Sequence, residues 1–268
     1  MVDKEGLKHY DSPMTKLQQN YWNHIAAEYH AITRISLTDF HCGPQIPGER
    51  KLKILPALKR GQAALELGCG GAQNSLILAK KGLRCTAMDI SREQIAYAAS
   101  LAGQHNVKID FIVSPLETFH TKVKGTFDFI HSSHAFEFVK NPAAILRRIA
   151  RFLKPGGHLM LSTVHPLYQG EWIELTASKR KAEDGLFIPT YFSPPDDIRL
   201  TPKGDVDVIS RAYPVSFWTE AFHAAGLTLV RLLEPPAIRN APYTSDDWAD
   251  DMDHLRAVPS TLILLAQK

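Results

Sequence analysis

A glycine-rich turn near residue 70 joins a predicted buried strand to a predicted helix, and few folds accommodate such a unit. Residues 63–67 form a compact apolar run after a polar, turn-forming segment, and Leu76, Ile77 and Ala79 recur at helical spacing after the turn. The glycines let the chain turn sharply and let a ligand lie against main-chain N–H groups. The pattern therefore predicts an α/β sheet with a ligand site at the carboxyl end of this strand.

An acidic residue, Asp89, ends the next apolar run, about 20 residues after the glycine turn. Nucleotide-binding βαβ units place at this position the acid that hydrogen-bonds the hydroxyls of a ribose. A glycine turn alone is weak evidence, because many sequences contain one by chance. The combination is stronger, because Glu66 precedes Gly68 by two residues, the turn reads Gly-x-Gly-Gly, and Asp89 ends the following strand.

Residues 65–70 match the motif (L/V)-(D/E)-x-G-x-G position by position, and on this motif the chain resembles the class I S-adenosylmethionine (SAM)-dependent methyltransferases. Within them it is similar to the small-molecule branch of the ubiquinone/menaquinone-biosynthesis type. Leu-Lys-Pro-Gly-Gly at residues 153–157 is a second match, whereas Ala72 stands where the family has a later glycine. The resemblance implies a Rossmann-like, seven-stranded, mostly parallel sheet with helices on both faces. It also implies an antiparallel last strand between the fifth and sixth strands.

The resemblance further implies that SAM is the cofactor and S-adenosyl-L-homocysteine the product. It places the methionine part of SAM against Gly68 and Gly70, with Glu66 near its ammonium group and Asp89 on the ribose. The turn after the third strand lacks the family's acidic adenine contact, and Leu116 there offers a backbone N–H and an apolar wall. The expected cofactor-binding residues are Glu66, Gly68, Cys69, Gly70, Asp89, Ile90, Leu116, Ser132 and Tyr21.

Two segments around this core are expected to enclose the ligands of a single domain that spans residues 1–268. Residues 15–33 show helical apolar spacing, and the resemblance makes residues 1–48 a helical lid; the alternative is an aromatic stripe packed on the core. Residues 164–214 leave the strand–helix alternation, and so long an excursion is usually functional. We expect residues 164–214 to be a substrate cap, with a satellite core as the alternative. The expected substrate-binding residues are Tyr29, Tyr168, Trp172 and Phe192.

Three side chains are candidates for catalysis. His134 lies at the carboxyl end of the predicted strand at residues 127–134, His165 follows the next strand, and Tyr191 lies in the expected cap. A hydroxyl acceptor needs a base within hydrogen-bond reach, whereas an amine or an activated carbon needs none. A lone histidine is more often structural than catalytic, so each role is a hypothesis. The sequence has no Asp/Glu/His cluster typical of a metal site, which predicts metal-independent transfer.

Composition and charge limit the classes of partner and the cellular compartment that we expect for this protein. The chain has 268 residues, 44% of them hydrophobic, which fits one large domain with its own core. Its net charge of +3 is spread along the sequence, and acids follow the one tight basic run at residues 179–181, which argues against a nucleic-acid partner. Three widely spaced cysteines favour a reducing cytoplasm, and no apolar run is long enough to cross a membrane. We expect a cytoplasmic monomer or homodimer whose partner is a small-molecule substrate.

The predicted activity is methyl transfer from SAM to an oxygen, nitrogen or carbon atom of a small aromatic or apolar metabolite. A nicotinamide-dependent oxidoreductase is an alternative, but Gln73 stands in place of a third glycine, and two closing strands without a crossover helix fit that class poorly. A non-enzymatic SAM-binding regulator is a second alternative, which the long aromatic excursion disfavours. Nucleic-acid methylation is a weaker one, because the chain has no Asn-Pro-Pro-Tyr-like motif and no basic stripe.

Overall fold

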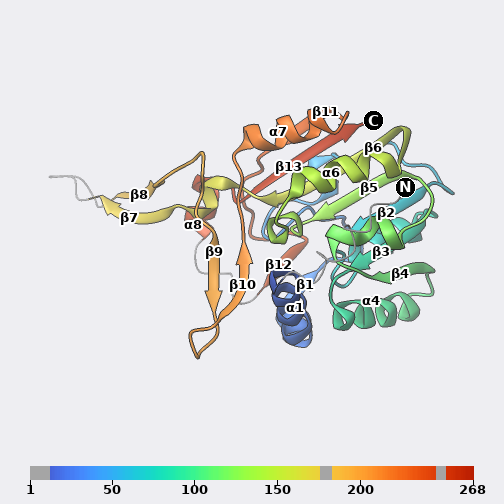
Figure 1. Ribbon diagram of the computed structural model, residues 1–268, viewed down its shortest axis with the longest axis horizontal. Coiled ribbons are helices and arrows are strands. Elements are labelled where there is room, and N and C mark those ends of the chain that lie inside the picture. Colours follow the sequence, from blue (N-terminus) through green and yellow to red (C-terminus); the bar gives the residue numbers. More distant parts are fainter. Residues whose placement is uncertain (1–12, 176–182, 246–251) are drawn as a thin grey trace.

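The computed structural model describes residues 13–175, 183–245 and 252–268. Its centre is a seven-stranded sheet in the order β11-β13-β6-β5-β2-β3-β4 (Figure 1). Neighbouring strands from β6 to β4 pair in parallel, whereas β13 pairs antiparallel with both β6 and β11. The strands are β2 Ala63–Leu67, β3 Arg84–Asp89, β4 Ile109–Val113, β5 Phe127–Ser133, β6 Leu153–Val164, β11 Thr228–Leu233 and β13 Thr261–Gln267. The predicted Rossmann-like sheet, with its antiparallel last strand between the fifth and sixth, is confirmed.

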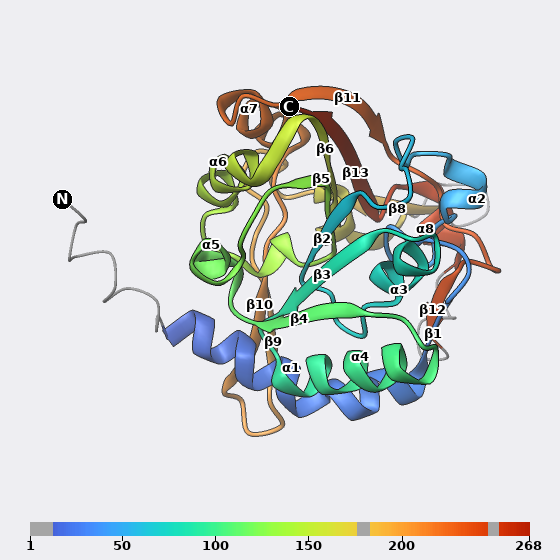
Figure 2. The same ribbon diagram turned by 90° about the vertical axis from the view of Figure 1, so that its right-hand side faces the viewer.

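Helices cover both faces of this sheet (Figure 2). One apolar core joins the sheet to α5, α6 and α7 and contains the fully buried Trp218. The other joins it to α3 and α4 and contains Phe40. Every residue of β2 is buried, as in a parallel strand that is covered on both faces. The helices are α1 Pro13–Ile32, α2 Glu49–Leu52, α3 Gln73–Lys80, α4 Arg92–Gln104, α5 Phe119–Lys122, α6 Pro142–Phe152, α7 Val215–Ala224 and α8 Met252–Ala257, with 3₁₀ turns at Leu116–Thr118, Phe136–Phe138 and Pro166–Gln169.

Side-chain caps fix where two of these helices begin. The Ser91 hydroxyl accepts a hydrogen bond from Gln94 N–H (3.1 Å) at the start of α4. The Asn141 side chain accepts one from Ala144 N–H (3.0 Å) at the start of α6, where Pro142 is the first helical residue. Ser91 and Gln94 form only half of a capping box, because the Gln94 side chain bonds His30 of α1 instead.

Residues 164–214 form two β-hairpins in their described part, where the sequence indicated only a loss of regular alternation. β7 Glu171–Leu175 pairs with β8 Glu183–Phe187, and β9 Asp197–Leu200 pairs with β10 Val206–Ser210. Both hairpins project from the body of the molecule (Figure 1). A third small pair joins β1 Thr33–Ile35 to β12 Tyr243–Ser245, so β12 and α8 lie in the connection from β11 to β13.

The described helices include none that is both long enough and apolar enough to cross a membrane. The assignment of residues 1–48 to a lid, of residues 164–214 to a cap and of the whole chain to one domain stays a prediction. Residues 1–12 of that lid lie outside the described residues.

Candidate functional site

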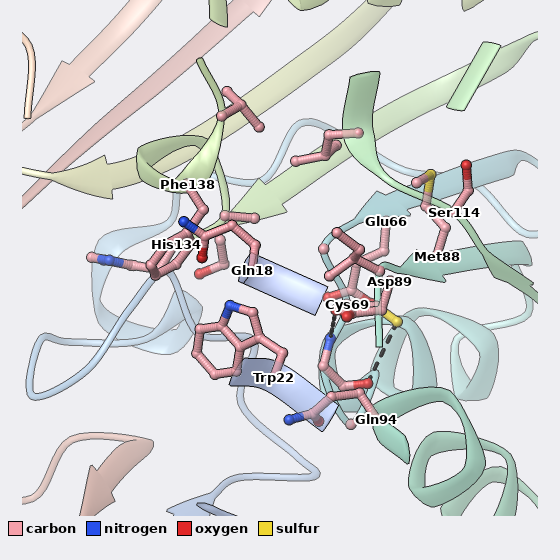
Figure 3. Close-up of a pocket in the computed structure, with 18 of the residues that line it drawn as sticks. Gln18, Trp22, Glu66, Cys69, Met88, Asp89, Gln94, Ser114, His134 and Phe138 are labelled. Atoms are coloured by element: carbon pink, nitrogen blue, oxygen red, sulfur yellow. Dashed lines mark hydrogen bonds between the residues drawn. The ribbon is translucent and has the colours of Figure 1, made fainter. Parts of the chain in front are cut away.

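The main pocket lies at the carboxyl ends of β2, β3 and β5, where the order of the parallel strands reverses. Open α/β sheets bind their ligands at such a switch point. Helix α1 forms the opposite wall of the pocket, and Figure 3 shows Gln18 and Trp22 of this helix near Cys69 and His134. The α1 residues that line the pocket are Met14, Thr15, Gln18, Trp22 and Tyr29.

The glycine turn folds into backbone conformations that L side chains rarely adopt. Gly68 has φ of +70° and Gly70 has φ of +50°, so both lie in the left-handed region. A Cβ atom on Gly68 would lie 2.3 Å from the Cβ atom of Ala135, which leaves no room for a side chain. Ala72, which stands where the family has a later glycine, also has a positive φ (56°), a conformation that glycine adopts more readily than alanine.

Asp89 holds this turn against the end of β3. Its Oδ2 atom accepts a hydrogen bond from Gly70 N–H (2.9 Å), and its Oδ1 atom accepts one from Ser91 N–H (2.9 Å). Burial raises the pKa of Asp89, and hydrogen bonds from the Ser91, Gly70 and Ile90 backbone oppose that rise. A carboxylate has about four acceptor positions, so Asp89 keeps capacity for the two hydroxyls of a ribose. The arrangement therefore fits the nucleoside part of SAM.

Glu66 and His131 form a buried pair beneath the glycine turn. The Glu66 Oε2 atom accepts a hydrogen bond from Ser75 N–H (3.0 Å), and burial raises the pKa of Glu66 to about 8. His131 Nδ1 lies 3.8 Å from Glu66 Oε1, and neither ring nitrogen of His131 has a hydrogen-bond partner in the described structure. Burial lowers the pKa of His131 to about 3. At neutral pH the two groups are thus a neutral imidazole beside a largely protonated carboxyl group, and not an ion pair.

Replacing His131 with leucine is expected to flatten the acid dependence of stability. The pKa of His131 is lowered on folding, so its contribution is complete above the unfolded value of about 6.5 and is lost as the pH falls from there towards about 3. Relative to wild type, His131→Leu should gain about 1.4 kcal/mol of unfolding free energy for each pH unit below 6.5. Urea unfolding at several pH values measures this gain. The exposed His24, changed to leucine, is the control. Equal pH slopes for His131→Leu and wild type would contradict the assignment.

His134 is held at the end of β5 by two hydrogen-bonding contacts. Its Nδ1 atom lies 3.0 Å from Glu137 Oε1, and its Nε2 atom lies 3.1 Å from Thr261 Oγ1. Glu137 is buried, and its other oxygen accepts a hydrogen bond from Thr163 (3.3 Å). A Glu137 oxygen that accepts from Nδ1 fixes the tautomer with the proton on Nδ1, which leaves Nε2 as an acceptor. Sequence reasoning missed Glu137, although its position three residues after His134 was a usable signal.

Helix α1 is joined to the β3–α4 turn by polar contacts. The side chain of Gln19 donates a hydrogen bond to the Ile90 carbonyl (3.2 Å), and His30 Nε2 lies 2.7 Å from Gln94 Oε1. The Asn23 Oδ1 atom accepts hydrogen bonds from the Ser91 hydroxyl (2.8 Å) and from Arg92 N–H (3.0 Å). These bonds place α1 across the pocket beside α4 (Figure 2), as a lid would lie.

Most of the expected cofactor-binding residues line this pocket. Ser132 and Tyr21 do not: the Ser132 hydroxyl donates to the Leu67 carbonyl (2.7 Å), and the Tyr21 hydroxyl accepts from Arg199 (3.4 Å). In each case an adjacent residue, Ser133 or Trp22, lines the pocket instead. The expected residues that line the pocket are Glu66, Gly68, Cys69, Gly70, Asp89, Ile90, Leu116, Tyr29 and His134.

None of the five site residues expected from positions 164–214 lines the pocket. His165 is buried, with Nε2 2.8 Å from Glu234 Oε1, and burial lowers its pKa against the effect of Glu234. Tyr191 accepts a hydrogen bond from the backbone N–H at the start of α7, and Trp172 stacks on a histidine of α8 at a ring distance of 3.9 Å. Tyr168 and Phe192 are 56% and 84% exposed. These positions give no support to the proposed cap lining.

Three further residues of the pocket wall received no role of their own from the sequence, although His41 lies within the expected lid at residues 1–48. His41 lies after β1 and Tyr243 lies in β12, and both line the pocket together with Phe138. Burial lowers the pKa of His41 to about 3, so its imidazole is neutral. Phe138 was recognisable from its place just after β5, but no local pattern marks His41 or Tyr243. The described residues contain no group of three or more histidine, cysteine, aspartate or glutamate side chains that could hold a metal ion.

Several solved structures share this fold. The SAM-dependent methyltransferase of Mesorhizobium loti superposes with a TM-score of 0.61, at 22% identity, over 81% of this chain and 94% of that one. The putative SAM-dependent methyltransferase of Listeria monocytogenes gives 0.58, at 17% identity, over the same shares. The [4+2]-cyclase SpnF gives 0.55, at 18% identity, over 96% of this chain and 94% of that one. These likenesses establish a class I methyltransferase fold. SpnF has this fold although it is named for another reaction.

A family model described as a methyltransferase domain matches residues 44–232, which is more than half of the chain. The chain belongs to this family, and within it to the class I SAM-dependent methyltransferases. The ubiquinone biosynthesis O-methyltransferase of Xanthomonas oryzae pv. oryzae is 36% identical over 105 residues, which are 39% of this chain and 44% of that protein. Other curated relatives with this name match over the same shares, so the chain matches less than half of the length of each.

Proposed function

We propose that this chain transfers a methyl group from SAM to a small aromatic or apolar metabolite. The observation that carries the proposal is the placement of Asp89, which lines the pocket and whose two oxygens accept hydrogen bonds from the backbone N–H groups of Gly70 and Ser91. That placement is the one expected of a ribose-binding acid after a glycine turn. Family membership supports SAM as the ligand, because the matched range contains both the turn and Asp89.

SAM supplies an electrophilic methyl group, and the work of the chain is to align an acceptor with it. The pocket offers Gly68 and Gly70 for the methionine part, with Glu66 behind them. Burial raises the pKa of Glu66 to about 8, and a cationic ammonium group placed beside it favours the charged carboxylate. Met88, Ile90 and Leu116 supply apolar surface along the nucleoside part, in line with the missing acidic contact there.

The acceptor is proposed to lie under α1 rather than under the two hairpins. Trp22 stands edge-to-face with Tyr29 (5.8 Å between ring centroids) and with Phe138 (5.4 Å), and all three line the pocket. Burial raises the pKa of Tyr29, so its hydroxyl stays neutral. A wall of neutral aromatic rings favours a planar or apolar acceptor. The curated relatives are named O-methyltransferases, which supports an oxygen acceptor.

His134 is the one candidate base that lines the pocket. Its contact with Glu137 makes Nε2 the acceptor, and in the present arrangement that nitrogen faces the Thr261 hydroxyl. A hydroxyl acceptor would have to replace Thr261 in this hydrogen bond. We therefore propose His134 as a base only for an oxygen acceptor, and neither a nitrogen nor a carbon acceptor requires it.

Thermal unfolding with SAM, S-adenosylhomocysteine and NADH tests the cofactor. A ligand at one hundred times its dissociation constant adds about 2.7 kcal/mol, which raises the unfolding midpoint of a chain this size by several degrees. We expect shifts with SAM and S-adenosylhomocysteine and none with NADH. A shift with NADH alone would overturn the proposal and favour a nicotinamide enzyme.

A further inference from the structure

The two hairpins carry half of the large apolar side chains that are exposed in the described structure. On the β9–β10 hairpin these are Ile198 (51% exposed), Leu200 (58%) and Val206 (42%). Val206 is the cross-strand partner of Leu200, so the three side chains share one face of the hairpin. Scattered exposed apolar residues need no explanation, but a cluster on a projecting hairpin indicates an interaction surface.

Among the described residues, only one edge of this hairpin is covered by other elements. Strand β10 packs against α1: Val208 is buried, and the Ile209 carbonyl accepts a hydrogen bond from the Gln18 side chain (2.8 Å). Strand β9 is the outer strand (Figure 1), all four of its residues are exposed, and β10 is its sole partner among the described strands. Such an edge leaves backbone N–H and C=O groups ready to pair with another strand.

The sequence of β9 is complementary to itself. It reads Asp197-Ile198-Arg199-Leu200, so an acid and a base lie two residues apart on one face, with the apolar residues on the other. In an antiparallel pair of two β9 strands centred on Ile198, each Ile198 faces its counterpart. Each Asp197 then faces Arg199 of the other copy. Opposite charges that face each other across strands stabilise the pair, and an isologous contact needs just this self-complementarity.

We propose that this protein forms a homodimer in which β9 pairs antiparallel with β9 of a second copy, around a two-fold axis at Ile198. The β9–β10 hairpins of the two copies then form one four-stranded sheet. Ile198 and Leu200 of one copy contact Ile198 and Leu200 of the other across the β9–β9 pair. Arg199 is 65% exposed in its side chain, and its contact with Asp197 of the same chain is long (3.7 Å). Its hydrogen bond to the Tyr21 hydroxyl is also long (3.4 Å), and this weakly held guanidinium group can turn towards Asp197 of the other copy.

This dimer contact adjoins the proposed lid. Gln18 of α1 lines the pocket and donates to the β10 backbone, and the Tyr21 hydroxyl of α1 accepts a hydrogen bond from Arg199. A second copy that pairs with β9 thereby also stabilises β10, the strand that packs against α1. The inference concerns the assembly of the chain and does not depend on the proposed methyl transfer.

Two single charge reversals test the pairing. Asp197→Arg puts arginine opposite arginine across the axis, and Arg199→Asp puts aspartate opposite aspartate. Analytical ultracentrifugation at low ionic strength should find wild type dimeric and each variant with a dimer dissociation constant raised roughly 30-fold. An equimolar mixture of the two variants should recover the dimer, because the two arginines of one variant's β9 then face the two aspartates of the other's.

The mixture separates the pairing from local damage, because each variant still lacks its own Asp197–Arg199 contact. Lys203→Asp, in the exposed turn of the same hairpin, is the matched control and should dimerise as wild type does. A wild-type chain that stays monomeric up to near-millimolar concentration would overturn the proposal. A mixture that fails to recover the dimer would overturn it too, and would direct the search to a different protein as the partner of β9.

Discussion

Replacing Asp89 with asparagine is expected to weaken SAM binding about 100-fold, which corresponds to about 3 kcal/mol. The two Asp89 oxygens accept hydrogen bonds from Gly70 and Ser91 N–H. An amide in this place turns an NH₂ group towards one of those donors, which leaves a buried donor without an acceptor. The same change removes the charge that strengthens hydrogen bonds from ribose hydroxyls, each worth about 1.5–3 kcal/mol to a charged acceptor. Isothermal titration calorimetry with S-adenosylhomocysteine measures the loss.

Asp110 provides the matched control for this substitution. It lies on β4, the strand next to β3, but its side chain is exposed. Asp110→Asn should therefore leave the affinity for S-adenosylhomocysteine within a factor of about two of wild type, since exposed substitutions away from a site have small effects. If Asp89→Asn bound the ligand as tightly as Asp110→Asn, the assignment of Asp89 to the ribose would be wrong.

The sheet and the glycine turn were predictable because their signals are local. A buried parallel strand reads as an apolar run, as β2 does, and the turn after it needs residues that accept a positive φ. The cap of α4 at Ser91 and the cap of α6 at Asn141 follow the same logic, because each depends on residues within one helical turn.

For two of the expected cofactor-binding residues, the adjacent residue in the sequence lines the pocket instead. The reason is the direction in which each side chain points. Successive residues of a strand point to opposite faces, so Ser132 turns to the Leu67 carbonyl while Ser133 turns to the pocket. Successive residues of a helix diverge by about 100°, which takes Tyr21 to Arg199 while Trp22 lines the pocket. A motif fixes the segment, and only the backbone fixes which neighbour faces the ligand.

The remaining wall of the pocket could not be predicted, because it depends on contacts between distant parts of the chain. His41 and Tyr243 meet at a ring distance of 5.0 Å although about 200 residues separate them. The β1–β12 pairing places Tyr243, and two hydrogen bonds with the Asn74 side chain hold the backbone of His41. Aromatic content drew attention to residues 164–214 instead. Aromatic content does not determine in which direction a side chain points. Phe192, for example, was expected to bind the substrate but is almost fully exposed.

Replacing Gly68 with alanine is expected to cost about 3 kcal/mol of folding stability. The φ of +70° costs an L residue about 1–2 kcal/mol. The new Cβ atom would lie 2.3 Å from Ala135 Cβ, and overpacking of this kind costs about 1–3 kcal/mol. Any relaxation that relieves the contact must move the segment after β5, which carries His134 into the pocket. Affinity for SAM should therefore fall together with the free energy of unfolding in urea.

A second glycine and a second substitution separate the two causes. Gly103 lies within α4, where a Cβ atom meets no other atom within 4 Å, so Gly103→Ala should stabilise the chain by about 0.5–1 kcal/mol. Adding Ala135→Gly to Gly68→Ala removes the Cβ–Cβ contact and leaves the positive φ, so the double variant should regain about half of the lost stability. If the double variant is no more stable than Gly68→Ala, the whole cost lies in the backbone. If Gly68→Ala itself behaves like Gly103→Ala, then the turn does not require a glycine at position 68.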